Sequence, residues 1–123
     1  MKKIVIFGSG SYAKVIFFEI IIKKKYDIIC FIDNNTKDRL KILTYKNKKY
    51  FNYKSLDHLK GYKNLYGVIA IGDNHLRRKV FNKINKLEKK FKWETIISKN
   101  ATISDNVSIG LGSVVLSNAY INS

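Results

Sequence analysis

Short apolar runs alternate along the chain with longer segments whose apolar residues recur at helical spacing. The runs at residues 3–7, 27–33 and 65–72 are bounded by polar or glycine positions, so they predict buried strands. Residues 11–24 predict a helix, with Ser11 as a candidate N-cap and three lysines favourable at its C-terminal end. The first strand, this helix and the second strand form a βαβ unit, which implies parallel strands and a right-handed crossover.

A second helix is predicted from Asn74, after the third strand. Its apolar residues fall on one helical face: Leu76, Val80, Phe81, Ile84, Leu87 and Phe91. Residues 40–53 fit an edge strand or a hairpin, and residues 55–60 fit a short helix capped by Ser55. Residues 92–97 predict a further strand that leads into the last part of the chain.

The last part of the chain follows a period of six residues. Large aliphatic side chains stand at Ile97, Ile103, Ile109, Val115 and Ile121, and smaller ones four positions later at Ala101, Val107, Ser113 and Ala119. This double track is typical of a parallel β-helix, in which each hexad supplies one strand and the larger side chains point inward. The predicted fold class is therefore α/β, with a Rossmann-like parallel-sheet domain over residues 1–96 and the first coil of a β-helix over residues 97–123.

Composition narrows the class of protein. The 123 residues are 46% apolar, enough for one domain with a real core, and they include a single cysteine, Cys30, in an apolar run. One cysteine excludes an internal disulfide and a cysteine-based metal cluster, so Cys30 is expected to be an inert core thiol. The apolar run before Gly8 is too short for a signal peptide, and residues 15–22 are too short to span a bilayer. We therefore predict a cytoplasmic protein with no membrane partner.

The formal net charge of +15 raises the question of nucleic-acid binding. The excess consists mainly of lysines scattered along the chain, which is typical of solvated positions and forms no stripe on one element. We therefore expect no nucleic-acid partner, although such a charge attracts anionic ligands in general.

A glycine turn between the first strand and the first helix is the strongest candidate site. Residues 8–13, GSGSYA, match G-x-G-x-x-[GA], in which glycines let the backbone approach a phosphate at a helix N-terminus. Asp33, at the end of the second strand, is placed to accept hydrogen bonds from a ribose hydroxyl. The competing interpretation is that Gly8 and Gly10 only permit a tight turn and close helix packing.

A third loop end, "AIGDNHLRRKV", adds Gly72 and Asn74 where open α/β sheets collect ligands. Arg77 follows in the first turn of a helix, where the helix dipole disfavours cations, so a bound anion would explain it. In a chain this basic, lysines and arginines also occur at positions that bind no ligand, so both explanations stay open. His58 is expected to be solvated, and His75 is a possible binding contact. Residues 1–96 assemble no catalytic set and no metal site.

The order of a glycine-turn α/β domain, "FID", "AIGDNHLRRKVFNKI" and hexapeptide repeats resembles the bacterial sugar acyltransferases of the PglD and NeuD type. The resemblance implies an N-terminal domain that binds a UDP-linked amino sugar or a sialic-acid-like sugar in glycan biosynthesis. It also implies a left-handed β-helix that forms trimers, binds acetyl-CoA between its coils and carries the catalytic histidine.

Carried over to this chain, the resemblance implies that Gly10, Ser11 and Tyr12 surround the sugar nucleotide, that Asp33 and Asn34 meet the uridine, and that Gly72 adds a contact. The family usually has glycine and histidine where Ser11 and Tyr12 stand, and often an acidic residue at Asn34. These departures leave the identity of the sugar open.

The sequence contains no histidine after His75, and the acetyl-CoA coils of the family would lie beyond its four hexads. We therefore expect a chain that binds without catalysing: a natural fragment, a shortened form or the partner of another polypeptide. Two alternatives remain, an NAD(P)-binding oxidoreductase-type domain, which does not explain the hexads, and a non-catalytic scaffold of the same fold.

Overall fold

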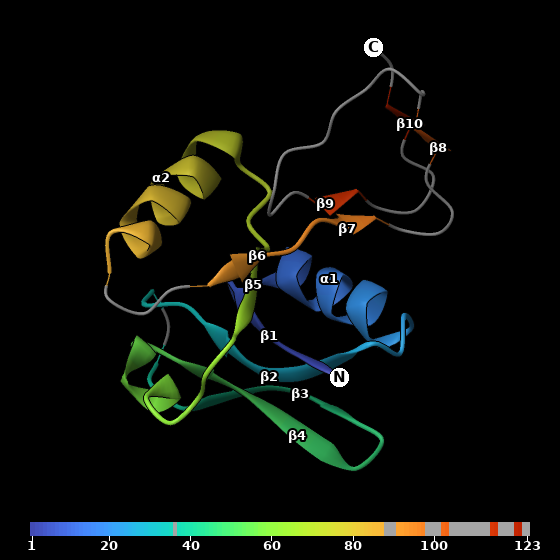
Figure 1. Ribbon diagram of the computed structural model, residues 1–123. Helices are drawn as coiled ribbons and strands as arrows, with labels where there is room; N and C mark the ends of the chain where they lie inside the picture. The colour runs from blue at the N-terminus through green and yellow to red at the C-terminus, as the bar shows by residue number, and fades with distance from the viewer. Residues whose placement is uncertain (36, 88–90, 98–101, 104–113, 116–119, 122–123) are drawn as a thin grey trace.

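The computed structural model of the chain (Figure 1) describes residues 1–35, 37–87, 91–97, 102–103, 114–115 and 120–121. Its helices are α1 (Ser11–Ile21), α2 (Asn74–Asn85) and the short 3₁₀ helix η1 (Leu56–Leu59). Its strands are β1 (Lys2–Phe7), β2 (Tyr26–Ile32), β3 (Leu40–Tyr45), β4 (Lys48–Tyr53), β5 (Tyr66–Ile69), β6 (Lys92–Trp93), β7 (Ile96–Ile97), β8 (Thr102–Ile103), β9 (Val114–Val115) and β10 (Tyr120–Ile121).

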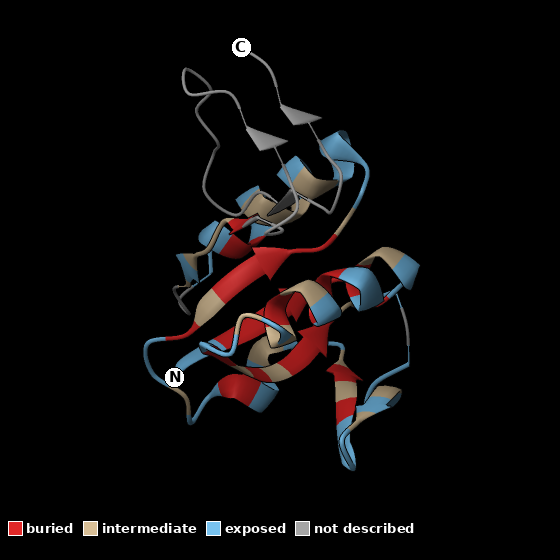
Figure 2. Cartoon of the chain, turned by 90° about the vertical axis from the view of Figure 1, so that its right-hand side faces the viewer, coloured by how far each residue is buried: buried red, intermediate tan, exposed pale blue. Residues whose placement is uncertain are grey.

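Six strands form one sheet in the order β3-β4-β2-β1-β5-β6, in which β3 and β4 are antiparallel and the other neighbours are parallel. Helix α1 covers one face, where Ile16 and Phe17 pack on β1 and β2, and η1 and α2 cover the other face through Leu59 and Ile84. The strands between these layers are the most buried part of the chain (Figure 2). The structure thus confirms the predicted α/β fold with a mostly parallel sheet.

Helix α1 departs from the sequence prediction at both ends. Its N-cap is Gly10, with no side-chain cap bond, and Ser11 is its first helical residue, so the assignment of Ser11 as the N-cap was wrong. The helix ends at Ile21 instead of residue 24, because Lys24 adopts a left-handed φ of 56° that turns the chain into β2. The lysines therefore follow the helix instead of closing it.

The segment between β2 and β5 resolves the choice between an edge strand and a hairpin in favour of the hairpin. Lys46 and Asn47 connect β3 to β4 with φ values of 48° and 66°, the left-handed pair that a tight two-residue hairpin turn requires. The second hairpin strand pairs in parallel with β2, through Phe31 opposite Asn52, so of the two hairpin strands only β3 lies at an edge of the sheet.

Helix α2 is shorter than its apolar periodicity predicts. Asp73 caps it by accepting a hydrogen bond from the Leu76 amide at 2.8 Å, and the helix ends at Asn85. Leu87 and Phe91 therefore lie beyond the helix, contrary to the prediction. The Phe91 ring instead packs edge-on against Phe7, with 5.1 Å between ring centroids.

Two small parallel sheets follow the main one. Residues Ile96 and Ile97 pair with Val114 and Val115, and Thr102 and Ile103 pair with Tyr120 and Ile121. Each pairing joins positions eighteen apart, which is the spacing of one coil made of three hexads. Ile109 and all four residues of the smaller track lie outside the described residues, so the inward orientation of the repeat stays a prediction, as does the boundary after residue 96.

Cys30 lies in the core of the sheet with no exposed surface, and this burial raises the pKa of its thiol from 9.0 to about 12. The folded state holds this proton more tightly than the unfolded chain does. Its contribution to stability is therefore complete below about pH 9 and is lost as the pH rises toward 12.

We expect the free energy of unfolding, measured by urea denaturation, to fall more steeply between about pH 8 and pH 10 in the wild type than in the Cys30→Ala variant. Other titrating groups are common to both proteins and cancel in the comparison. Equal pH slopes would show that the thiol of Cys30 does not titrate differently in the folded and unfolded states.

Among the residues that the structure describes, no helix is both long enough and apolar enough to cross a membrane.

Candidate functional site

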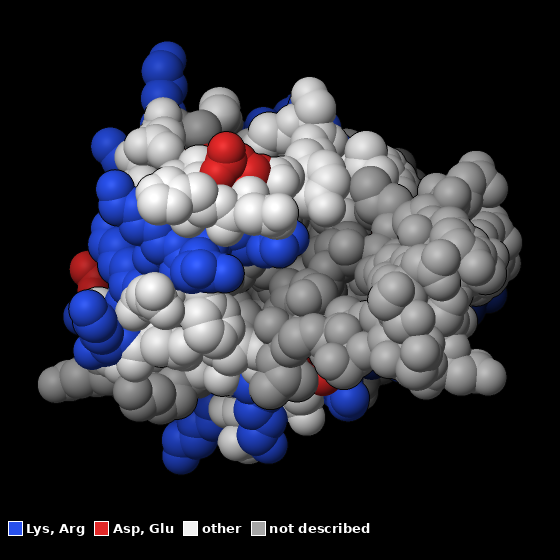
Figure 3. Space-filling model, turned by 90° about the horizontal axis from the view of Figure 1, so that it is seen from above, with Lys and Arg blue, Asp and Glu red and all other residues white. Residues whose placement is uncertain are grey.

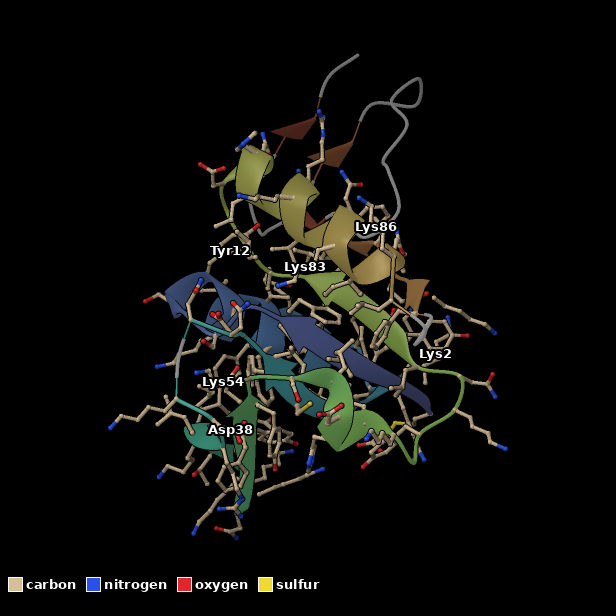
Figure 4. All side chains as sticks on the ribbon, turned by 90° about the vertical axis from the view of Figure 1, so that its left-hand side faces the viewer. Lys2, Tyr12, Asp38, Lys54, Lys83 and Lys86 are labelled. Atoms are coloured by element: carbon tan, nitrogen blue, oxygen red, sulfur yellow. The ribbon has the colours of Figure 1, made fainter. Side chains whose placement is uncertain are left out.

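A cleft of about 1040 Å³ opens at the carboxyl ends of the parallel strands. Its floor contains Phe7, Ile32 and Ala70, from the ends of β1, β2 and the turn after β5. Helix α2 forms one wall, and the segment that leads into η1 forms the other, with the ends of the central strands between them (Figure 4). This is the edge of an open α/β sheet at which ligands bind in general.

The glycine turn forms one end of the cleft and is fixed by backbone contacts. Gly8 donates its amide to the Ile32 carbonyl at 2.9 Å and has a φ of +120°, a conformation that side-chain-bearing residues rarely adopt. A Cβ atom on Gly8 would lie 2.7 Å from the Ala70 carbonyl oxygen, so the turn runs directly against the loop after β5. Gly10 and Gly72 face open space instead, which leaves their backbone accessible to a ligand.

Asp33 presents a half-buried carboxylate next to this turn. One carboxylate oxygen accepts a hydrogen bond from the Ser9 hydroxyl at 3.0 Å, and the other accepts one from the Asn35 amide at 2.9 Å. These two donors fix the plane of the carboxylate at the mouth of the cleft. Ser9 lies inside the predicted glycine motif, but its hydrogen bond to Asp33 was not predicted, because it depends on the exact register in which the two strands end.

Asn52 holds the loop that follows Asp33. Its side chain is completely buried in β4, and its amide nitrogen donates to the Asp33 carbonyl at 3.1 Å and to the Lys37 carbonyl at 3.4 Å. The backbone on both sides of the exposed Asn34 is therefore tied to the sheet. The sequence signal was a single asparagine among the aromatic residues of a strand, which sequence analysis did not single out.

The structure brings most of the predicted site residues together and leaves two elsewhere. The predicted residues that line the cleft are Gly8, Gly10, Ser11, Tyr12, Asp33, Asn34 and Gly72. Asn74 and Arg77 do not line it: the Arg77 guanidinium donates to the Asn74 side-chain oxygen at 2.7 Å within the first turn of α2. Their expected role in binding has no support from this arrangement and remains a prediction.

Cations and apolar residues from the two walls also line the cleft, and sequence analysis did not predict them. The cations are Lys54, Lys60 and Lys83, and the apolar wall residues include Leu56, Ile71, Leu76, Val80 and Leu87. The helical spacing of α2 carried a usable signal, because Leu76, Val80, Lys83 and Leu87 recur every three or four positions.

The two histidines lie outside the described lining of the cleft. His58 is exposed and stacks on the Tyr53 ring, with 3.6 Å between centroids and an interplanar angle of 13°. His75 is exposed on the first turn of α2. In the described part of the chain, no group of three or more histidine, cysteine or acidic side chains is arranged to hold a metal ion. The polar groups that line the cleft, namely backbone amides, hydroxyls, two carboxylates and three lysines, are suited to binding a polar anionic ligand.

Comparison with known proteins agrees with the resemblance found in the sequence. Residues 3–84 match the PglD N-terminal domain. The acetyltransferase domain of PglB from Neisseria gonorrhoeae has 25% sequence identity and a TM-score of 0.72 over 98% of this chain and 56% of its own. PerB from Caulobacter crescentus, solved with CoA and GDP-perosamine, has 24% identity and a TM-score of 0.74 over 100% of this chain and 55% of its own.

The chain thus spans about half the length of these solved structures. A comparison with curated proteins gives no match.

Proposed function

Because the chain belongs to the family of PglD N-terminal domains, we propose that its α/β domain binds the nucleotide-sugar substrate of a bacterial sugar acetyltransferase. The observation that carries this proposal is the convergence of three loop ends on one cleft. The glycine turn, Asp33 and the open backbone at Gly72 come from three different strands and line the same cavity. Such a convergence at the carboxyl edge of a parallel sheet is the usual setting of a nucleotide site.

Each part of a nucleotide sugar has a matching surface in the cleft. The first intrahelical bond of α1 runs from the Lys14 amide to the Gly10 carbonyl, so the preceding amides at Ser11 and Tyr12 are available to a diphosphate. The Asp33 carboxylate is suited to the ribose hydroxyls. The apolar walls offer Leu56 and Leu76 to the faces of the base.

The identity of the base is the finer part of the proposal. We expect uridine, as the resemblance to the PglD and NeuD type implies, whereas the PerB structure contains a guanosine nucleotide. Calorimetric titration of the intact chain with UDP, GDP and NAD separates these cases. Binding of UDP or GDP without binding of NAD supports the proposal, and clear NAD binding without either diphosphate overturns it in favour of an oxidoreductase-type domain. Equally weak binding of all three points to a non-catalytic scaffold.

The acetyl transfer itself is assigned to the β-helix part of the protein. The PglB domain has also been solved with acetyl coenzyme A. By analogy we propose that acetyl-CoA is the acyl donor. A histidine that is not among these 123 residues, which contain none after His75, would act as general base and take the proton of the sugar amine or hydroxyl, which attacks the thioester carbon and expels the CoA thiolate. We further propose a trimeric assembly that works in the cytoplasm.

Replacing Asp33 with alanine tests the ribose contact. We expect UDP to bind about 5-fold to 150-fold more weakly, because a hydrogen bond to a charged group contributes roughly 1–3 kcal/mol. Asp27→Ala is the matched control, since Asp27 lies near the opposite end of β2 and forms an ion pair with Lys48 at 3.8 Å. Equal UDP affinities of the two variants, measured by calorimetry, would contradict the assigned role of Asp33.

A further inference from the structure

One charged residue interrupts the apolar stripe that α2 turns toward the cleft. The α2 residues Leu76, Val80, Lys83 and Ile84 line the cavity, whereas the neighbouring cations Arg77, Arg78 and Lys79 do not. Seen from above, lysine and arginine side chains gather over the side of the molecule where α2 lies (Figure 3). Among the helical cations in that part of the chain, Lys83 alone lines the cavity.

A second lysine lines the opposite wall. Lys54 follows directly after β4, and its backbone amide donates to the Asp38 carboxylate at 3.1 Å, which fixes the start of this wall. Figure 4 shows Lys83 below α2 and Lys54 on the other side of the cleft. The cavity is thus bordered by cations on both walls, Lys83 on one and Lys54 on the other, where Lys60 also lies but is paired with Asp57.

Among the described residues, neither ammonium group has an ion-pair partner. In the described residues the ion pairs join Lys2 to Glu94, Lys48 to Asp27 and Lys60 to Asp57, so neither Lys54 nor Lys83 belongs to one. Of the two carboxylates that line the cleft, Asp57 is paired with Lys60 at 3.8 Å, and Asp33 accepts hydrogen bonds from Ser9 and Asn35.

The tilt of helical side chains points Lys83 back toward the glycine turn. The helix starts directly after β5, at the carboxyl edge of the sheet, and side chains in a helix tilt toward its N-terminus. The long Lys83 side chain therefore leans back toward the edge at which Gly10 presents its open backbone. Lys54 lies at the same edge, because Tyr53, the last residue of β4, pairs with Ile32 of β2.

We propose that Lys54 and Lys83 form a clamp that holds the diphosphate of the bound nucleotide sugar between the two walls. This inference rests on the proposed function and adds the residues that neutralise the ligand's charge. A compact ammonium group on a flexible stem is suited to phosphate oxygens whose position is set by other contacts, here the amides of the glycine turn. The role that a bound anion would give to Arg77 thus falls to Lys83.

The clamp is tested by comparing UDP with uridine, which has the same base and ribose but no phosphate. We expect Lys54→Gln and Lys83→Gln each to weaken UDP binding about tenfold while uridine binding stays unchanged, because each removes one charge-assisted contact to phosphate. The UDP affinity of the double variant should be lower than that of the wild type by the product of the two single-variant factors. Higher ionic strength should reduce the difference in UDP affinity between the wild type and each variant.

Two lysines outside the cavity serve as matched controls. Lys86 caps the C-terminus of α2, and Lys49 lies within β4, and neither lines the cleft. Lys86→Gln and Lys49→Gln should bind UDP as the wild type does, with melting temperatures like those of the clamp variants. If the wild type prefers GDP, GDP and guanosine replace UDP and uridine in every arm.

The outcomes separate the clamp from the proposed function. A wild type that binds no nucleoside diphosphate contradicts the proposed function itself. A wild type that binds UDP, with clamp variants that match their controls, overturns the clamp alone. Equal losses for UDP and uridine also overturn it, because the lysines would then act on the base or on the shape of the cleft.

Discussion

Replacing Gly8 with alanine should destabilise the domain by roughly 3 to 5 kcal/mol, because two costs combine. The backbone of Gly8 has a φ of +120°, which an alanine adopts only under strain. The added Cβ would also lie 2.7 Å from the Ala70 carbonyl oxygen, a backbone atom that cannot move without displacing the loop after β5. The free energy of unfolding, measured by denaturant titration, gives the size of the effect.

The other cleft glycines provide the controls for this prediction. A Cβ on Gly10 or Gly72 would meet no atom within 4 Å, so both alanine variants should retain nearly the full free energy of unfolding. Gly10→Ala should nevertheless weaken UDP binding, since its methyl group occupies the surface that a diphosphate approaches. A stable Gly8→Ala variant would show that the turn and the loop after β5 can move apart.

Replacing Asn52 with alanine should cost about 2 to 4 kcal/mol of unfolding free energy and should also weaken nucleotide binding. The substitution leaves a small cavity in β4 and removes the donor that serves the carbonyls of Asp33 and Lys37. The loop that carries Asn34 then loses its attachment to the sheet, so the binding surface becomes less ordered. Denaturant titration and UDP calorimetry on the same variant measure the two effects.

Asn85→Ala is the matched control for this prediction. Asn85 is exposed at the end of α2 and accepts a hydrogen bond from the Trp93 indole at 2.9 Å, so its loss should cost about 1 kcal/mol or less. UDP affinity should not change in this variant. If Asn52→Ala were no less stable than Asn85→Ala, the buried amide would contribute little to the loop.

Features encoded in adjacent residues were predictable, and features created by the packing of distant elements were not. The buried strands and the glycine turn each depend on a few neighbouring residues, and the structure contains them; the β3–β4 hairpin was one of two alternatives that the sequence left open. The end of α1 was misjudged because the left-handed backbone of Lys24 is not visible in a run of helix-compatible residues. The end of α2 was misjudged because Leu87 and Phe91 continue the apolar spacing after the helix has stopped.

The candidate site likewise contains residues that local sequence predicted and residues that only the packing of distant elements brings together. Asp33 was predictable because it ends the strand that follows the glycine-turn helix, a local relation within one βαβ unit. Lys54 and Lys83 border the same cleft only because β4 lies beside β2 and α2 forms the opposite wall. Arg77 was singled out because a cation in the first turn of a helix suggests a bound anion, yet its side chain bonds to Asn74 and does not line the cavity.

The central position of β1 also determines the order in which the chain can assemble. The β3–β4 hairpin closes over a two-residue turn and can form within about 1–10 μs, the time scale of an isolated hairpin. Strand β1 must wait for β5, because each of its pairings there, such as Ile4 with Tyr66, closes a loop of about 60 residues whose entropy cost comes first. The rate-limiting step of folding is therefore expected to be the docking of β5 on β1, the event that also creates the nucleotide edge.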